Sequence, residues 1–267
     1  MAETALITGA SGGIGEEFAK LIASKGVDLV LVARSGDKLQ RLAESLTAAH
    51  KVQVHCLALD LSTPSSAAQV ESFLESKKLS IDVLINNAGF GTFGPFVESD
   101  LAGELGEIQL NVTTLTHLTR LLLPAMVRRG KGRILNVAST AAFQPGPMMA
   151  VYYATKAYVL SFSEALANEL KGTGVTSTCL CPGPTSTGFN ARAKLGNGGM
   201  LSKKSVLMDA ATVARRGYDG MMKGRRLVIP GFLNKMLAHS TRMGTRGLSA
   251  SVVRRIMDGI RAAKDAP

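Results

Sequence analysis

The first two-thirds of the chain alternate between short apolar runs and longer segments in which apolar residues recur at helical spacing. We predict strands at the apolar runs, which are residues 5–8, 29–33, 53–58, 83–86, 133–138 and 177–181. These runs are rich in β-branched and aliphatic residues and are too short for normal helices, as expected of strands that are buried on both faces. Helices are predicted between them, for instance at residues 16–25, 38–48 and 65–76. The alternation predicts right-handed βαβ units, and hence a doubly wound α/β fold whose parallel sheet of about seven strands has helices on both faces.

The last part of the chain follows a different pattern. Residues 188–206 are rich in Gly, Lys and Ser with weak periodicity, so we predict a loop there that has room for a short helix. A seventh strand is predicted at residues 226–229, followed by amphipathic stretches at residues 232–237 and 251–263. The length of 267 residues suits one α/β unit. We therefore predict a single domain over residues 1–267, with a basic C-terminal extension that starts near residue 232.

The net charge of +11 is concentrated toward the C-terminus. Ten basic residues and two acidic ones beyond residue 222 account for +8 of it. The basic residues are Lys223, Arg225, Arg226, Lys235, Arg242, Arg246, Arg254, Arg255, Arg261 and Lys264. Such a surface either serves solubility alone or attracts an anionic substrate, an acidic carrier or an anionic membrane, and the sequence leaves these alternatives open. No recognised nucleic-acid motif accompanies the charge, so no nucleic-acid partner is expected.

Cysteine usage and hydropathy place the chain among intracellular proteins. Cys56, Cys179 and Cys181 lie in or beside apolar runs, and they have neither metal-ligand spacing nor a disulfide pattern. We expect buried free thiols and no metal site. The N-terminal residues enter a strand almost at once and do not resemble a signal peptide, and no apolar stretch reaches membrane-spanning length. The expected location is the cytoplasm.

A glycine-rich turn joins the first predicted strand to the first predicted helix. It contains Gly9, Ser11, Gly12, Gly13, Ile14 and Gly15. Backbone N–H groups at a helix N-terminus attract phosphate, and glycines permit both the tight turn and a close approach of the backbone. Because the turn follows the first strand directly, it predicts a pyrophosphate site and a Rossmann fold that binds a dinucleotide.

The end of the second predicted strand indicates which dinucleotide is bound. In NAD-binding folds an acidic side chain about twenty residues beyond the glycines binds the adenosine ribose hydroxyls. This chain has Arg34 and Ser35 there, and the Arg34 guanidinium can pair with a 2′-phosphate. Asp37 is expected at the N-cap of the next helix. NADP(H) is therefore the predicted cofactor, with NAD as the less favoured alternative.

Tyr152 and Lys156 lie four residues apart at the start of a predicted helix, so they share one of its faces. The pKa of a phenol is about 10, and a neighbouring ammonium group lowers this pKa toward neutral pH. A Tyr and a Lys at this spacing also occur on ordinary helices. Whether this pair is catalytic therefore depends on where it lies in the fold. Ser139 ends the fifth predicted strand, at the edge of the sheet where α/β proteins bind ligands, and Tyr152 follows soon after it. Together these side chains predict an acid–base site beside the cofactor.

At this point the sequence resembles the short-chain dehydrogenase/reductase family, over nearly the whole chain to about Gly231. The four positions of the family's catalytic tetrad are matched by Asn111, Ser139, Tyr152 and Lys156. Asp60 and Leu61 match the family's adenine contact, and Asn87, Ala88 and Gly89 match the element after its fourth strand. The segment that holds the nicotinamide is matched by Pro182, Gly183, Thr185 and Thr187, with Thr187 at the carboxamide position.

The resemblance implies an NADPH-dependent oxidoreductase that interconverts a carbonyl compound and its alcohol. Tyr152 would exchange the proton and also contact the cofactor, and Ser139 would hold the substrate oxygen. Lys156 would bind the nicotinamide ribose and lower the pKa of Tyr152, while Asn111 would position a water. Tyr153 and Tyr158 are expected to be packing residues.

Substrate and assembly are less constrained by the sequence. Residues 90–98, 141–151 and 188–206 carry Phe, Met and Leu, and they predict an apolar pocket for a 3-oxoacyl thioester, a ketone or an aldehyde. The extension resembles longer members of the family and argues against the usual tetramer, while apolar helices near residues 110–126 and 158–170 favour a homodimer. The alternative is a cofactor-binding interaction protein whose basic tail docks on an anionic membrane or an acidic partner.

Overall fold

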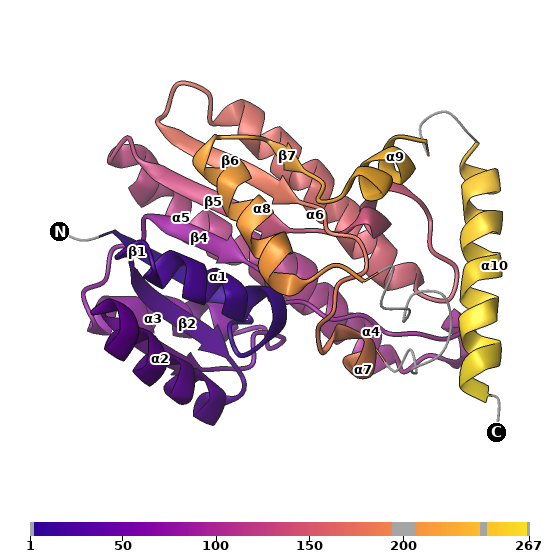
Figure 1. Cartoon of the computed structure of the whole chain (residues 1–267), viewed down its shortest axis with the longest axis horizontal. Coiled ribbons are helices and arrows are strands. Elements are labelled where there is room, and N and C mark those ends of the chain that lie inside the picture. Colours follow the sequence, from indigo (N-terminus) through magenta and orange to yellow (C-terminus); the bar gives the residue numbers. More distant parts are fainter. Residues whose placement is uncertain (1–2, 194–206, 241–244, 266–267) are drawn as a thin grey trace.

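A parallel sheet with the strand order β3-β2-β1-β4-β5-β6-β7 forms the centre of the computed structural model, which describes residues 3–193, 207–240 and 245–265 (Figure 1). Its strands are β1 (Thr4–Thr8), β2 (Asp28–Ala33), β3 (Val54–Ala58), β4 (Val83–Asn86), β5 (Gly132–Val137), β6 (Val175–Leu180) and β7 (Leu227–Val228). The strand order reverses between β1 and β4, which creates the crevice in which doubly wound folds bind ligands. The predicted fold class is confirmed.

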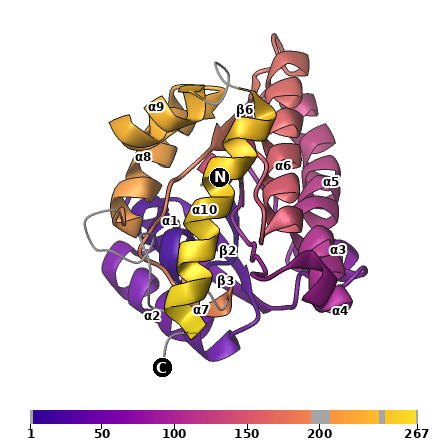
Figure 2. The ribbon, with the colours of Figure 1, turned by 90° about the vertical axis from the view of Figure 1, so that its right-hand side faces the viewer.

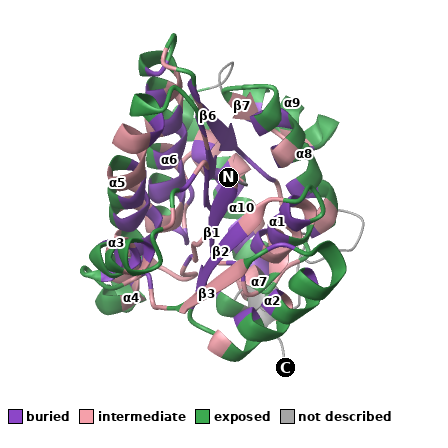
Figure 3. Cartoon of the chain, turned by 90° about the vertical axis from the view of Figure 1, so that its left-hand side faces the viewer, coloured by how far each residue is buried: buried purple, intermediate pink, exposed green. Residues whose placement is uncertain are grey.

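Helices cover both faces of the sheet because its strands present apolar side chains alternately to either side. In β2, Leu29 and Leu31 belong to one core cluster, and Val30 and Val32 belong to the other. The first face is covered by α1 (Gly13–Ala23), α2 (Gly36–His50) and α8 (Ala210–Met222). The second face is covered by α3 (Ser66–Ser76), α5 (Leu115–Arg128) and α6 (Ala150–Glu169). Figure 3 shows the strands between these outer layers, buried in the middle of the sheet and half-buried at its edge strands β3 and β7.

A long helical segment with an unusual middle precedes β5. It begins with α4 (Leu101–Ile108), continues through the π-helical turn η2 (Gln109–Thr114) and ends with α5. Asp100 caps α4, because its carboxylate accepts hydrogen bonds from the N–H groups of Ala102 and Gly103. Single π-helical turns are frequent at functional sites, and this one contains Asn111.

The C-terminal elements lie at the carboxyl ends of the strands, together with the short turns η1 (Phe96–Glu98) and η3 (Thr140–Phe143). They include α7 (Phe189–Arg192), α9 (Phe232–Ser240) and α10 (Arg246–Asp265). Figure 2 shows α10 crossing in front of this edge of the sheet. The predicted extension is therefore largely helical, and it packs on the rest of the protein.

Most predicted boundaries agree with the structure, with a few differences. Helix α2 begins at Gly36 with Ser35 at its N-cap, so the prediction that Asp37 is the N-cap is wrong. Asp37 lies in the first turn instead, where its charge is favourable at the positive end of the helix dipole. Strand β7 is shorter than predicted. The predicted loop at 188–206 contains α7, and residues 194–206 lie outside the described part.

Two expectations about side chains and hydropathy can be compared with the structure. All three cysteines are free thiols; Cys179 and Cys181 are buried as predicted, and Cys56 is half-buried. Across the described ranges, no helix combines the length and the apolarity that are needed to cross a bilayer.

Candidate active site

Backbone conformation and hydrogen bonds to the β4 loop fix the shape of the glycine-rich turn. Gly9 has φ of 68° and Gly13 has φ of 58°, values at which residues with side chains are strained. The Asn87 side-chain amide donates to the carbonyl oxygens of Thr8 and Gly9, at 2.9 and 3.3 Å. Gly15 lies so close to the Gly9 carbonyl that any Cβ there would collide with it. The sequence therefore needs glycine at these positions for the turn to form.

The space in front of this turn fits a pyrophosphate. A Cβ added at Gly12 would meet no atom within 4 Å, so Gly12 faces open space at the start of α1. The N–H groups of a first helical turn have no partner within the helix and suit an anion. A Cβ added at Gly13 would lie 3.0 Å from Thr187, so the structure brings the predicted nicotinamide segment close to the turn. Ser11 and Ile14 beside it are half-buried.

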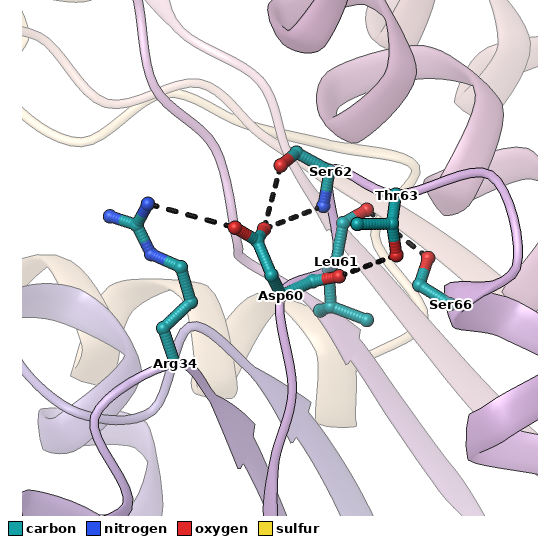
Figure 4. Close-up of polar contacts among 6 residues, drawn as sticks. All are labelled: Arg34, Asp60, Leu61, Ser62, Thr63 and Ser66. Atoms are coloured by element: carbon teal, nitrogen blue, oxygen red, sulfur yellow. Dashed lines mark hydrogen bonds and ion pairs between the residues drawn. The ribbon is translucent and has the colours of Figure 1, made fainter.

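Arg34 lies after β2 and extends toward Asp60, which follows β3 (Figure 4). Its guanidinium Nη1 is 3.9 Å from Asp60 Oδ2, and both side chains are about half exposed. Asp60 also accepts hydrogen bonds from the Ser62 backbone N–H and hydroxyl, at 2.9 and 2.7 Å. An exposed ion pair of this length is weak, so the guanidinium remains able to bind another anion. Ser35 is exposed beside it, whereas Leu61 is buried.

Arg192 at the end of α7 is a third charged group at this place. Burial and the like charge of Arg34 lower the pKa of the Arg192 guanidinium, while Asp60 raises it. Burial raises the pKa of the Asp60 carboxyl, but its hydrogen bonds to Ser62 and the charges of Arg34 and Arg192 outweigh burial and lower it overall. Two guanidinium groups therefore gather at the predicted adenosine end. The sequence pattern did not indicate Arg192, because it lies in the weakly periodic segment.

Ser139, Tyr152 and Lys156 converge at the carboxyl end of β5. The Ser139 hydroxyl lies near enough to the Tyr152 side chain to affect its pKa. Ser139 Oγ accepts a hydrogen bond from the Ala141 N–H at 3.1 Å and donates to the Pro182 carbonyl oxygen at 3.5 Å. Lys156 Nζ lies 5.7 Å from the centre of the Tyr152 ring and donates a hydrogen bond of 2.9 Å to the Val137 carbonyl oxygen. Helix α6 supplies both Tyr152 and Lys156, so these predicted catalytic side chains lie together.

Burial dominates the electrostatics of these groups. It raises the pKa of the Tyr152 phenol well above its ordinary value of 10.0, although the neighbouring Ser139 hydroxyl lowers it. Burial also lowers the pKa of Lys156 to about 8, although nearby groups that include Glu107 raise it. The expected lowering of the Tyr152 pKa by Lys156 is thus outweighed by the apolar surroundings. Tyr152 is protonated in this arrangement, which is the state that a proton donor needs.

Asn111 connects the loop after β4 to α6. Its side-chain amide donates to the Phe90 carbonyl oxygen at 2.9 Å and to Thr155 Oγ1 at 3.1 Å, and its Oδ1 accepts from the Phe90 N–H at 3.2 Å. A Cβ added at Gly89 would lie 3.0 Å from Asn111 Oδ1 and 3.3 Å from Lys156 Nζ. Gly89, Asn111 and Lys156 are therefore in close contact, and the tetrad forms one group.

The segment after β6 faces the glycine turn. It carries the predicted residues Pro182, Gly183, Thr185 and Thr187. Thr185 Oγ1 donates to the Gly183 carbonyl oxygen at 2.9 Å, and Thr187 Oγ1 accepts from the Phe189 N–H at 3.3 Å. Any Cβ at Gly183 would collide with Asn234 of α9. Helix α9 therefore packs on the predicted nicotinamide segment, a contact that the sequence pattern did not indicate.

Glu107 is a buried acid near the tetrad, and no motif in the sequence indicated it. Its Oε2 accepts hydrogen bonds from the Thr92 N–H and hydroxyl, both at 3.1 Å, and its Oε1 has no partner among the described residues. Burial raises the pKa of Glu107 to about 7, Thr92 lowers it, and the nearby charge of Glu104 raises it further. The charge of Glu107 in turn raises the pKa of Lys156.

Apolar side chains surround Tyr152 on the substrate side. The buried members of this cluster are Ala141, Met148, Met149, Tyr153, Ala193, Val253, Met257 and Ile260. Tyr153 is thus a packing residue, whereas Tyr158 is partly exposed and stacks on Phe162. Four members come from the segments that were predicted to line the pocket. The last three come from α10, and the sequence pattern did not indicate that this helix contacts the site.

Comparison with known protein families shows which family this chain belongs to. The sequence model of the family described as short chain dehydrogenase matches residues 3–197. The chain belongs to the short-chain dehydrogenase family. Its relatives include the very-long-chain 3-oxoacyl-CoA reductases of Bos taurus and Rattus norvegicus, which are 35% and 36% identical to it over 186 residues. Each match covers 68% of this chain and 59% of the relative, so the chain spans about three-fifths of the length of these relatives.

Solved structures of similar proteins superpose on most of this short-chain dehydrogenase. One from Sphingobium yanoikuyae, in complex with NADPH, has a TM-score of 0.81 and 35% identity, and the match covers 92% of this chain and 94% of that one. The bulky-bulky ketone specific alcohol dehydrogenase from Comamonas testosteroni has a TM-score of 0.77 and 31% identity, with 90% and 91% covered. Both matches cover a larger share of this chain than the family model does.

Proposed function

We propose that this short-chain dehydrogenase is an NADPH-dependent oxidoreductase that interconverts a hydrophobic carbonyl compound and its alcohol. One observation carries the proposal: Ser139, Tyr152 and Lys156 converge at the carboxyl end of β5, beside a glycine turn shaped for pyrophosphate. Family membership and relatives that are named as reductases support the reaction class.

In the reductive direction the Tyr152 hydroxyl gives its proton to the substrate oxygen. The Ser139 hydroxyl, which lies beside the same phenol, orients that oxygen. NADPH, when bound, supplies the hydride that reduces the carbonyl carbon. Lys156 holds the nicotinamide ribose, and its ammonium group stabilises the phenolate that remains after proton transfer. Asn111, which lies against Gly89 next to Lys156, positions a water that exchanges protons with solvent.

A substrate panel followed by NADPH absorbance tests this function. It contains acetoacetyl and longer 3-oxoacyl thioesters, steroid ketones and aliphatic aldehydes, with NADH in parallel. We expect turnover of one class, and a fall in kcat of about 10²- to 10⁴-fold for Tyr152→Phe, because the general acid is removed. NADPH affinity should stay within about threefold, since only a hydroxyl at the substrate side is lost. Near-normal turnover by Tyr152→Phe would contradict the mechanism.

Arg34 carries the proposed preference for NADPH over NADH. Its guanidinium is available to an anion and has Arg192 near it, and the Sphingobium yanoikuyae relative is a complex with NADPH. Replacing Arg34 with Asp should weaken NADPH binding by about 10- to 100-fold while leaving NADH binding little changed, because a charge-assisted hydrogen bond is lost. Arg41→Asp on exposed α2 is the matched control. Equal effects on the two cofactors in titrations would overturn the assignment.

The proposed assembly is a homodimer. Helix α4 supports it, because this helix exposes apolar side chains and buries acidic ones. Leu101, Leu105 and Ile108 of α4 are exposed, while Glu104 and Glu107 of the same helix are buried. Residues three and four apart lie on one face, so α4 presents an apolar stripe to its surroundings. Contiguous exposed apolar surface marks interaction sites.

The proposed location is the cytoplasm with peripheral contact to an anionic membrane, and α9 supports the contact. Its outward residues Phe232, Leu233, Met236 and Leu237 are all exposed, and Lys235 lies among them. Exposed apolar side chains next to basic ones suit the interface of an anionic bilayer. On centrifugation the protein should sediment together with vesicles of phosphatidylcholine and phosphatidylglycerol. The Leu233→Ser substitution should reduce the fraction of protein that sediments with them. Equal pelleting of both proteins would dismiss the contact.

The alternative function receives less support. In it the chain is an interaction protein whose basic tail binds an anionic membrane or an acidic partner. The inner face of α10 is buried over Tyr152, so much of the tail belongs to the reductase site. Arg254 pairs with Asp258 at 2.8 Å within α10, and Arg261 lies 3.7 Å from Glu98, so two of the basic side chains of the tail face acidic ones of the same chain. NADPH binding without turnover of any carbonyl compound in the panel would favour this alternative.

A further inference from the structure

Two acidic side chains of α4 are buried, one helical turn apart. Glu107 is 0% exposed and Glu104 is 7% exposed, although leucines of the same helix are exposed. Glu107 Oε1 and Glu104 Oε2 each have no hydrogen-bond partner among the described residues, and the charge of Glu104 disfavours a charge on Glu107. Burying a carboxylate without partners costs stability, and such acids are concentrated at functional sites. Packing alone does not account for acids at these positions of α4.

The loop of residues 89–92 lies directly against two catalytic side chains. A Cβ added at Gly89 would lie 3.3 Å from Lys156 Nζ. A Cβ added at Gly91 would lie 2.8 Å from Tyr152 Cδ2, closer than real Cβ atoms approach their neighbours. Glycine at both positions therefore lets the backbone of the loop reach the tetrad. Whatever holds this loop also determines how it lies against Tyr152 and Lys156.

Glu107 holds the end of this loop. Its Oε2 accepts hydrogen bonds from the Thr92 N–H and the Thr92 hydroxyl, both at 3.1 Å. The Asn111 side chain, one turn further along the same helical segment, donates to the Phe90 carbonyl oxygen and accepts from the Phe90 N–H. The segment formed by α4 and η2 thus binds the loop at two places. The carboxylate of Glu107 is thereby fixed in position relative to Lys156.

The charge of Glu107 acts on Lys156 across the contact between α4 and α6. Burial lowers the pKa of Lys156 to about 8, and the nearby Glu107 carboxylate opposes this lowering. The other ionisable groups that face Lys156 are the Cys179 and Cys181 thiols of β6 and the Tyr152 phenol of α6. Of these neighbours Glu107 is the carboxylic acid, so it supplies the negative charge that balances the ammonium group.

We propose that Glu107 is a positioning residue that acts on the reaction through Lys156: the loop of residues 89–92 fixes its carboxylate near the Lys156 ammonium group, and the negative charge keeps that group in its charged form. This inference rests on the proposed reductase function, in which the ammonium group stabilises the Tyr152 phenolate. The chain thereby keeps an acid that lowers its stability at alkaline pH but extends carbonyl reduction to higher pH.

Glu107→Gln tests the proposal, because Gln accepts the hydrogen bonds of Thr92 but carries no charge. The kcat/KM of the parent should fall as Lys156 loses its proton above about pH 8, and in the variant this fall should begin at lower pH. At pH 9 the variant should therefore be about threefold slower or more. At pH 6 the two proteins should agree within about twofold, because burial raises the pKa of Glu107 to about 7 and the acid is mostly protonated there.

Two further variants separate the proposed role from a loss of structure. Glu104→Gln removes the charge of the other buried acid on the same helix, and it should keep the pH profile of the parent. Glu107→Asp keeps the charge and should restore most of the activity at pH 9. Urea unfolding should find Glu107→Gln at least as stable as the parent at pH 8, whereas loss of a merely structural group would lower stability and activity together. A parent-like profile in Glu107→Gln, or the same change in Glu104→Gln, would overturn the proposal.

A titration of Lys156 that needs no turnover separates failure of this inference from failure of the proposed reaction. In protein labelled with carbon-13 at the lysine ε position, the NMR signal of Lys156 is assigned by its absence in Lys156→Arg. Its titration midpoint should lie near pH 8 in the parent and lower in Glu107→Gln. If no carbonyl compound is reduced but the midpoint moves in this way, the role of Glu107 stands and the reaction is wrong. If turnover is normal and neither the midpoint nor the pH profile responds to Glu107→Gln, the reaction stands and the role of Glu107 is wrong.

Discussion

At the scale of single residues, the site is governed by ionisable groups that burial pushes toward their neutral forms. Burial raises the pKa of Tyr152, lowers that of Lys156 to about 8 and raises that of Glu107 to about 7. Each direction follows from the cost of placing a charge in an apolar environment. Tyr152 therefore stays protonated across the neutral range, and pH acts on this site through Lys156 and Glu107.

We expect kcat/KM for carbonyl reduction to fall above about pH 8, because the Lys156 ammonium group loses its charge there. The fall belongs to Lys156, since the raised pKa of Tyr152 keeps the phenol protonated over the same range. In Lys156→Arg the guanidinium stays charged, so this decline should disappear even though the absolute rate is lower. Rates with one substrate at a series of pH values measure this. The same decline in both proteins would exclude Lys156 as its origin.

Glu107 gives a prediction about stability. Its folded-state pKa is raised from 4.5 to about 7, so the folded protein binds the proton more tightly than the unfolded chain does. The resulting stabilisation is complete below pH 4.5 and is lost as the pH rises through 7. Glu107→Gln removes this loss, because Gln stays neutral and can still accept the hydrogen bonds of Thr92. Its free energy of unfolding should exceed that of the parent by about 1–3 kcal/mol at pH 8 and match it near pH 5.

Urea unfolding at these two pH values tests the prediction for Glu107. Glu75→Gln on the exposed side of α3 is the control, and it should behave like the parent protein at both. A parent protein whose stability does not decline between pH 5 and pH 8, relative to Glu107→Gln, would contradict the account.

At the scale of elements, the sequence predicted what depends on local pattern. Strands such as β2 are continuous apolar runs, and the glycine turn needs Gly9, Gly13 and Gly15 for reasons that are visible in the residues themselves. The buried position of Glu107 was not predictable, because α4 buries acids and exposes leucines, the reverse of the usual pattern. The place of α10 over Tyr152 depends on contacts about a hundred residues apart in sequence, which periodicity does not encode.

The contact between Gly183 and α9 allows an element-scale prediction. A Cβ at Gly183 would collide with the Asn234 side chain, which donates hydrogen bonds to the Pro230 carbonyl oxygen at 2.8 Å and to Met208 Sδ at 3.4 Å. Gly183→Ala should therefore displace α9 and destabilise the protein by about 1–2 kcal/mol, the cost of lost hydrogen bonds and overpacking. Adding Asn234→Gly removes the obstacle. Thermal unfolding should show less than additive loss in the double variant, and full additivity would mean that the two residues do not interact.

At the scale of the whole molecule, two exposed apolar faces differ in charge and in position. The stripe of α4 has acidic residues behind it, whereas α9 carries Lys235 and is followed by the basic α10. Figure 2 shows α4 and α9 on opposite sides of α10. Two copies of a basic face repel one another but are attracted to anionic lipid, so the α9 face suits a membrane and the α4 face suits a second copy of the chain.

A pair of charge substitutions separates these two roles. Leu105 is 56% exposed, so Leu105→Glu leaves the fold of a single chain nearly unchanged, yet it would bury an unpaired charge in the dimer. The cost of about 2–5 kcal/mol corresponds to a dimer dissociation constant that is about 30-fold to several thousand-fold higher. Light scattering at micromolar concentration should then give the mass of a monomer. Leu233→Glu on α9 should keep the dimer mass and instead reduce sedimentation with anionic vesicles. Loss of the dimer in Leu233→Glu, with an intact dimer in Leu105→Glu, would mean that the two faces exchange the roles assigned to them here.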